Sequence, residues 1–396
     1  MSQKTIVCLY THGGGMRGLI PALIMQRIEE KTGLAMVDMV DIFSGPSTGS
    51  ILNAAINVPH PHQPDRPKYR ARHLVRFYER EGRRIFPQDA LRQLRGMLHD
   101  FNNRVTKIET LDWLMSRGHY DPTNLGRSLR ALYGKTQLSD ALRSIVIPVY
   151  NIGEPTEAKR KSKNPMSAIG HHAIWLKKIT IDKAKTPQIM TKGSMFDAVM
   201  GSTAAPTYFP CHEFEAELNG KKETITAVDG SIFDSAPITY MSLLRRHVPK
   251  NTKIIMIVLG TGMSKISYTK DEWNRFGSLG VVDPANNMPL INIFFNASES
   301  ALASAFEEEL GDGLYVFNKS LTPPNSSKLS KKHARKAREE LNLPDQNLDD
   351  ASPENIERLK TFTETIIQEN QEQFDHLCDF LVDNHKKRSK KSIFGS

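Results

Sequence analysis

The sequence has few cysteines and no long apolar run, and each absence excludes a class of protein. Its three cysteines lie far apart, which excludes a disulfide framework or a cysteine zinc site and favours a reducing compartment. No stretch approaches about 18 uninterrupted apolar residues, so no membrane-spanning helix is expected. The N-terminus lacks the pattern of a general secretory signal peptide. We therefore expect a cytoplasmic protein, and export by a signal-peptide-independent route stays open.

The charge balance is basic. The chain of 396 residues carries 53 Lys and Arg against 44 Asp and Glu, a formal net charge of +9. Such an excess attracts anionic surfaces, either a membrane or nucleic acid, or serves solubility alone. Many arginines fall in residues 66–107. Apolar residues at 74, 75, 77 and 78 indicate an amphipathic helix there, with a polar face that is either solvated or directed to lipid.

Two glycine-bearing stretches organise the first part of the chain, at residues 13–18 and 45–49. The second has the Gly-x-Ser-x-Gly pattern of a nucleophile elbow, with Ser47 at its centre. Each stretch follows an apolar run typical of a strand and precedes a helical pattern. The strands are expected at 5–10 and 37–43, and the helices at 19–31 and 50–57.

These two stretches predict a nucleophile and an oxyanion hole. The glycines of the elbow permit a sharp turn, so Ser47 is expected at the carboxyl end of a strand, where open α/β sheets place their sites. The earlier glycine turn can aim backbone N–H groups at the same point. The candidate donors are Gly13, Gly14, Gly15 and Met16.

A serine nucleophile needs a base to take its proton. The late histidines lie in the basic or helical tail and follow no buried strand, so a histidine triad is poorly supported. Asp229 ends an expected strand at 224–228 and is followed at once by Gly230. We expect it on the same sheet edge as Ser47, where it could accept the proton directly. An Asp-Gly pair is by itself also an ordinary turn.

Nucleotide binding is the rival interpretation of the first glycine stretch. Gly13, Gly15 and Gly18 match the dinucleotide fingerprint, and Asp38 follows about twenty positions on. However, three consecutive glycines are unusual for that fingerprint, and the next strand ends in a serine elbow rather than a ribose-binding acid. We therefore expect no nicotinamide cofactor. We also expect no metal, because an oxyanion hole supplies the electrostatic stabilisation.

Strands and helices alternate as far as residue 262, which predicts an α/β layered domain. Further strands are expected at 144–150, 173–181, 224–228 and 253–259. After about residue 285 the pattern changes to long helices at 289–310 and 354–384, with one strand at 314–317. We divide the chain into a catalytic domain at 1–284, a mainly helical region at 285–385 that packs on or caps it, and a basic, disordered tail at 386–396.

The motifs and their order resemble the patatin-like phospholipase family, in its bacterial-type form. The Gly-Gly-Gly-x-Arg-Gly motif of that family matches residues 13–18, its serine elbow matches residues 45–49, and its Asp-Gly-Gly or Asp-Gly-Ala motif corresponds to Asp229 and the two residues after it. Weaker matches lie at 78–86, 202–210 and 259–262.

This resemblance implies a three-layer α/β/α sandwich with a mostly parallel central sheet and a helical C-terminal extension. It implies a Ser–Asp dyad that hydrolyses fatty-acyl esters of glycerophospholipids or other glycerolipids, with Ser47 as nucleophile and Asp229 as proton acceptor, and without a cofactor. It further implies peripheral contact with an anionic membrane surface and no nucleic-acid partner. The supporting motif positions are Arg17, Gly18, Gly45, Gly49 and Gly230.

Three residues depart from the family pattern. His12 stands where aspartate is usual, Ser231 replaces glycine or alanine, and Asp234 replaces asparagine. None of them removes the nucleophile, the base or the glycine turn. They keep open the alternative of a membrane- or partner-binding protein with a vestigial site. The basic tail either docks on an anionic membrane or is a solvated end.

Overall fold

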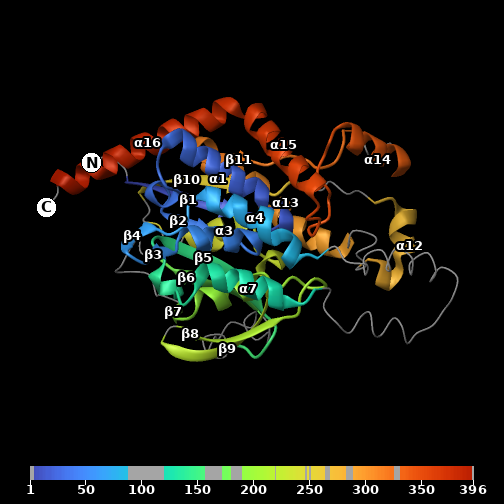
Figure 1. The fold of residues 1–396 in the computed structure, drawn as a ribbon, viewed down its shortest axis with the longest axis horizontal. Coiled ribbons are helices and arrows are strands. Elements are labelled where there is room, and N and C mark those ends of the chain that lie inside the picture. Colours follow the sequence, from blue (N-terminus) through green and yellow to red (C-terminus); the bar gives the residue numbers. More distant parts are fainter. Residues whose placement is uncertain are drawn as a thin grey trace.

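A mixed β-sheet forms the centre of the molecule (Figure 1). The structure, a computed structural model, describes residues 4–87, 120–156, 172–179, 190–218, 220–245, 248, 251–263, 268–281, 289–324 and 331–394. Expected features outside these ranges, including most of the arginine-rich stretch beyond residue 87, lie outside the described residues.

One half of the sheet is parallel. Its strands follow the order β11-β10-β1-β2-β5, and every neighbouring pair in this series runs in the same direction. Their bounds are β1 (Lys4–Thr11), β2 (Ile42–Ser44), β5 (Ser144–Asn151), β10 (Thr252–Leu259) and β11 (Leu314–Phe317). Their carboxyl ends therefore meet at one edge of the sheet.

The other half is antiparallel and continues from β5 in the order β9-β8-β7, with β6 also paired to β5. The bounds are β6 (His172–Lys178), β7 (Met190–Lys192), β8 (His212–Leu218) and β9 (Lys221–Asp229). β9 overlaps β5 by three pairs only, and the last of them joins Asp229 to Val149. This short overlap places the carboxyl end of β9 near the carboxyl ends of the parallel strands.

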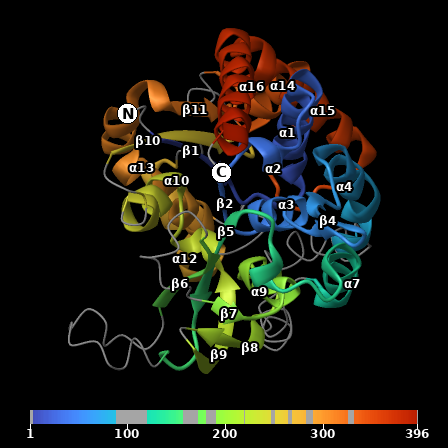
Figure 2. The same ribbon diagram turned by 90° about the vertical axis from the view of Figure 1, so that its left-hand side faces the viewer.

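Helices cover both faces of the sheet, as Figure 2 shows. Val7 and Leu9 of β1 pack into the larger core, which includes α1 (Leu19–Thr32) and α3 (Thr48–Ile56). The intervening residues of β1 face the second core with α10 (Ala236–Thr239) and α13 (Pro289–Leu310). Successive side chains of a strand point to opposite faces of the sheet, so β1 contributes side chains to the core beneath each helical layer. The α/β fold class expected from the sequence is confirmed.

The described residues form further helices and a small hairpin. The helices are α2 (Met36–Met39), α4 (Ala71–Ile85), α7 (Pro122–Tyr133), α9 (Met195–Ser202), α12 (Lys270–Gly280), α14 (Lys331–Glu340), α15 (Pro353–Glu369) and α16 (Gln371–Phe394), and the hairpin is β3 (Pro59–His60) with β4 (Gln63–Pro67). Figure 1 shows α12 and α14 at one end of the molecule, away from the sheet. Among the described residues, no helix combines the length and the apolar character that crossing a membrane requires.

Three sequence expectations are corrected. The strand expected at 37–43 is the short helix α2 followed by β2, because a short apolar run fits either structure. The helix expected at 354–384 is interrupted at Asn370 and forms α15 and α16. The tail expected to be disordered from 386 instead continues α16 to Phe394, and Arg388 binds the Asp41 carboxylate there with two hydrogen bonds. The division of the chain at residue 284 stays a prediction.

Candidate active site

Ser47 occupies a strained turn between β2 and α3. Its φ of 52° and ψ of −128° lie where non-glycine residues are uncommon. A Cβ at Gly45 or Gly49 would overlap the carbonyl oxygen of Thr11, at the end of β1, so both positions require glycine. This is the strand–turn–helix context that a nucleophile-elbow pattern predicts. The strain holds the serine side chain out at the sheet edge.

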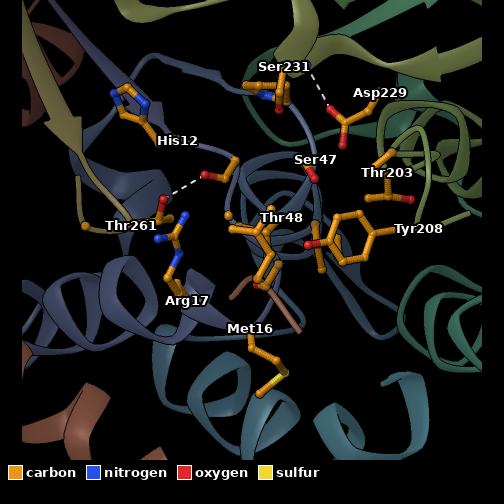
Figure 3. Close-up of a pocket in the computed structure, with 18 of the residues that line it drawn as sticks. His12, Met16, Arg17, Ser47, Thr48, Thr203, Tyr208, Asp229, Ser231 and Thr261 are labelled. Atoms are coloured by element: carbon orange, nitrogen blue, oxygen red, sulfur yellow. Dashed lines mark hydrogen bonds between the residues drawn. The ribbon is translucent and has the colours of Figure 1, made fainter. Parts of the chain in front are cut away.

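The carboxylate of Asp229 faces Ser47 (Figure 3). Asp229 is 1% exposed, and its Oδ1 accepts a hydrogen bond of 2.8 Å from the N–H of Ser231. Burial raises the pKa of the Asp229 carboxyl to about 6, while the hydrogen bond from the Ser231 N–H and the nearby hydroxyl groups of Ser47 and Ser231 oppose this rise. The serine and the aspartate that the sequence singled out are therefore brought together, 182 positions apart in the chain.

The position of Asp229 depends on the register of β9. Because β9 runs antiparallel to β5, strand polarity alone would carry its carboxyl end away from Ser47. The overlap of only three pairs stops it at Val149, and a Cβ at Gly230 would overlap the Pro148 carbonyl group. Asp229 thus lies at the same sheet edge as Ser47 because β9 overlaps β5 only briefly and a tight turn follows.

The glycine turn after β1 presents backbone N–H groups. Its three carbonyl groups are all engaged: Gly13 O accepts from Thr261 Oγ1 at 2.7 Å, Gly14 O from the Arg17 N–H at 3.0 Å, and Gly15 O from Thr48 Oγ1 at 3.0 Å. Within the part of the chain that the structure describes, the N–H groups of the same three glycines have no protein acceptor. Fixed peptide planes with free N–H groups suit the binding of an oxyanion.

Met16 does not belong to this donor set. Its N–H donates to the carbonyl oxygen of Leu348 at 2.7 Å, so the oxyanion role expected for Met16 is corrected. The same carbonyl packs on Gly15, which has a φ of 54° and no room for a Cβ. The loop before α15 therefore holds the glycine turn in position. The sequence offered no signal for Leu348, since any residue supplies a backbone carbonyl.

Arg17 and Gly18 form the base of the turn. Arg17 is 7% exposed and its side chain lines the cavity beside Ser47. Burial lowers the pKa of its guanidinium to about 10, and Tyr208 and Asp345 act in the opposite direction. A Cβ at Gly18 would overlap the side chains of Thr48 and Tyr78, so glycine is needed for the close approach of this turn to α3 and α4.

A cavity of about 120 Å³ opens beside Ser47. One end is polar and holds the serine, the aspartate and the glycine turn. The wall is apolar and is formed by Ile51, Phe77, Ile85, Phe86, Leu125 and Phe209. A mostly apolar cavity with a few convergent polar groups fits an acyl ester, with the acyl chain along the wall and the carbonyl at the polar end.

The three departures from the family pattern leave this arrangement intact. His12 Nε2 lies 3.4 Å from Glu299 Oε1 of α13, and His12 lies apart from Ser47 and Asp229 in Figure 3. Burial raises the pKa of the Asp234 carboxyl to about 7. Its hydrogen-bond donors are Tyr10 Oη at 3.0 Å, Trp175 Nε1 at 3.0 Å and Thr239 Oγ1 at 2.8 Å. Ser231 donates to Asp229, as described above.

Metal binding finds no support in the described residues. They contain no group of three or more His, Cys, Asp or Glu side chains placed to hold a metal ion.

Comparison with known proteins gives consistent matches. The family model of patatin-like phospholipase matches residues 10–242. Patatin-like protein 2 of Oryza sativa subsp. indica is 25% identical over 405 residues, which cover 96% of this chain and 88% of that protein. Patatin-11 of Solanum tuberosum is 25% identical over 424 residues, covering 99% and 93%. The solved structure of human GIVD cytosolic phospholipase A2 with methyl gamma-linolenyl fluorophosphonate has a TM-score of 0.41 at 12% identity and covers 96% of this chain and 59% of that chain.

Proposed function

Because the chain belongs to the patatin-like phospholipase family, we propose that it is a lipid acyl hydrolase of the phospholipase A type, which cleaves fatty-acyl esters of glycerolipids with a Ser47–Asp229 dyad. One observation carries this proposal. The strained Ser47 faces a buried carboxylate at the polar end of an apolar cavity, next to backbone N–H groups that have no protein acceptor among the described residues.

The first half of the reaction forms an acyl-serine. Ser47 Oγ attacks the ester carbonyl carbon and its proton passes to the Asp229 carboxylate. The N–H groups of Gly14 and Gly15, with Gly13 beside them, hold the oxyanion of the tetrahedral intermediate. The intermediate collapses, the C–O bond to the glycerol oxygen breaks, and that oxygen takes the proton from Asp229.

The second half releases the fatty acid. Asp229, again ionised, accepts a proton from water as the water attacks the acyl-serine, and Ser47 leaves with that proton. A carboxylate is usually a weak base. Burial raises the pKa of Asp229 to about 6, which brings it closer to the range in which a general base works near neutral pH.

Substitution of the dyad tests this proposal. Ser47→Ala and Asp229→Asn should each lower fatty-acid release from a glycerophospholipid by about 10³-fold or more, and the double variant should be hardly worse, because the two groups act as a unit. Mass spectrometry measures the released acid, and thermal unfolding checks the fold. Ser300→Ala, at an exposed serine of α13, is the matched control and should keep full activity.

Two results would overturn the proposal in different ways. Near-normal activity of Asp229→Asn would remove the aspartate as base. A wild-type chain that hydrolyses no ester and is not labelled by a fluorophosphonate at Ser47 would instead support a binding protein with a vestigial site.

A further inference from the structure

A second groove lies beside the catalytic cavity, between α4 and α7, which lie side by side (Figures 1 and 2). It has a volume of about 490 Å³. Four exposed arginines line it, Arg76, Arg80 and Arg84 from α4 and Arg127 from α7. We call it the arginine groove.

The spacing of these arginines does not serve the stability of α4. Arg76, Arg80 and Arg84 follow one another at intervals of four residues, so they form a single stripe on the helix. Like charges at this spacing repel each other and destabilise a helix. The repulsion between these arginines is relieved when a bound anion neutralises their charge.

The groove supplies little negative charge of its own. Glu81 is the carboxylate that lines it, and this side chain accepts a hydrogen bond of 2.8 Å from Ser128 Oγ and lies 3.5 Å from Arg84. In the ranges that the structure describes, Arg76, Arg80 and Arg127 make no ion pair. Four guanidinium groups therefore face one carboxylate.

The arginine groove and the catalytic cavity are neighbours. Phe77 lines both of them. Along α7, Leu125 lines the cavity while Asn124 and Arg127 line the groove. An anion held in the groove would thus sit next to the apolar wall that we assign to the acyl chain.

We propose that the arginine groove binds the phosphate groups of anionic lipids at a bilayer surface and docks the enzyme with its catalytic cavity beside the membrane. Guanidinium groups form paired hydrogen bonds with phosphate oxygens, which makes arginine well suited to this ligand. The open groove next to an apolar cavity fits a lipid, whose charged head and acyl chains are joined. This inference rests on the proposed lipid substrate.

The basic tail is less well placed for that task. Arg388 near the end of α16 donates to the carboxylate of Asp41 and to the carbonyl oxygen of Thr5. Thr5 is the second residue of β1, whereas the catalytic site lies beyond the other end of that strand, and eight residues of extended strand span about 25 Å. The tail therefore sits toward the sheet edge opposite Ser47.

Vesicle binding by full-length variants tests the inference. Every variant carries Ser47→Ala, so that binding is measured without hydrolysis. The groove variant adds Arg76→Gln, Arg80→Gln and Arg127→Gln. The control variant adds Lys386→Gln, Lys387→Gln and Lys390→Gln, which removes the same charge from the tail. Each is sedimented with phosphatidylcholine vesicles that contain phosphatidylglycerol, and with vesicles that lack it.

The groove variant should bind the anionic vesicles about a hundredfold more weakly, since each cation near such a bilayer is worth roughly fivefold in affinity. The control should lose less than about fivefold, because charges at the far edge are screened beyond a Debye length. With Ser47 restored, the groove variant should hydrolyse a soluble short-chain ester at the normal rate, which separates docking from catalysis.

Three outcomes would overturn the inference. Equal losses in both variants would mean that net charge alone drives binding. Unchanged binding of the groove variant would show that the groove does not contact the bilayer. In the third outcome, the groove variant keeps normal vesicle binding but no longer binds inositol hexakisphosphate as the parent chain does. That result would assign the groove to a soluble polyphosphate. Thermal unfolding of each variant checks that the fold is retained.

Discussion

The environment of Asp229 balances two opposing effects on its carboxyl group. Burial removes water from the carboxylate and raises its pKa to about 6. The N–H and hydroxyl of Ser231, together with the Ser47 hydroxyl, stabilise the ionised form and lower the pKa. The carboxyl is thus a stronger base than an exposed aspartate and is still mostly ionised at neutral pH.

Ser231→Ala tests this balance. The change removes the side-chain hydroxyl and keeps the backbone donor, so the pKa of Asp229 should rise above its wild-type value of about 6. In the proposed mechanism the ionised carboxylate is the active form, so the acid limb of kcat/KM should move to higher pH. The profile is measured on a soluble short-chain ester over about pH 5–9, a range that brackets the expected pKa.

Asp234→Asn provides the discriminating control for that profile. Burial raises the pKa of Asp234 to about 7, so this group could also titrate in the measured range. If the acid limb follows Asp229, it should persist in Asp234→Asn. An acid limb that disappears in Asp234→Asn, or one that Ser231→Ala leaves in place, would contradict the assignment to Asp229.

At the scale of single residues, the sequence predicted those parts of the site that depend on local turn chemistry. Ser47 and the glycines of its turn follow from one short pattern, because a strained turn needs particular residues. Leu348 and the exclusion of Met16 could not be predicted. Their hydrogen bond joins backbone atoms of segments more than 300 positions apart, and any pair of residues can form such a bond.

At the scale of elements, the loop before α15 holds the glycine turn in place. Asn355, which is 2% exposed, ties this loop together. Its Nδ2 donates to the Asp350 carbonyl oxygen and its Oδ1 accepts from the Asp345 N–H, both at 2.7 Å. Leu348 lies between these two points and accepts the Met16 N–H. We therefore infer that Asn355 positions the backbone N–H groups that we propose as oxyanion donors.

Asn355→Ala should therefore lower kcat on a soluble ester by about tenfold, within the range for a disturbed oxyanion donor, with little change in KM. Unfolding experiments should also show a loss of about 1–3 kcal/mol, because buried partners are left unsatisfied. The control is Thr363→Val, which removes a buried hydroxyl of α15 that bonds only within the helix. A variant that loses stability but keeps the wild-type kcat would show that the loop does not shape the glycine turn.

The elements themselves were predicted unevenly. Buried strands such as β1 and β10 follow from continuous apolar runs, and their parallel pairing agrees with that pattern. β8 was missed, although Phe214, Ala216 and Leu218 alternate with polar residues in it. The register of β9 against β5, which places Asp229, depends on the length of their overlap and has no signature in either strand alone.

At the scale of the whole molecule, the C-terminal helix closes back on the start of the chain. Figure 1 shows α16 ending near the N-terminus. Arg388 donates to both carboxylate oxygens of Asp41, at 2.9 and 2.6 Å, and Asp41 also accepts the N–H of Val7. A run of basic residues was expected to be a solvated tail, because its partner lies 347 positions away in the sequence.

Arg388→Ala tests whether this contact stabilises the molecule. A bidentate, partly buried pair should contribute about 2 kcal/mol, so its loss should lower Tm by a few degrees in a chain of this size. Lys386→Ala is the matched control, since its contact with Asp383 is exposed and 3.9 Å long, and should leave Tm within about one degree. Both variants should keep wild-type kcat on a soluble ester, because the pair lies toward the sheet edge opposite Ser47. Equal Tm values for Arg388→Ala and the wild type would mean that the end of α16 is a solvated tail after all.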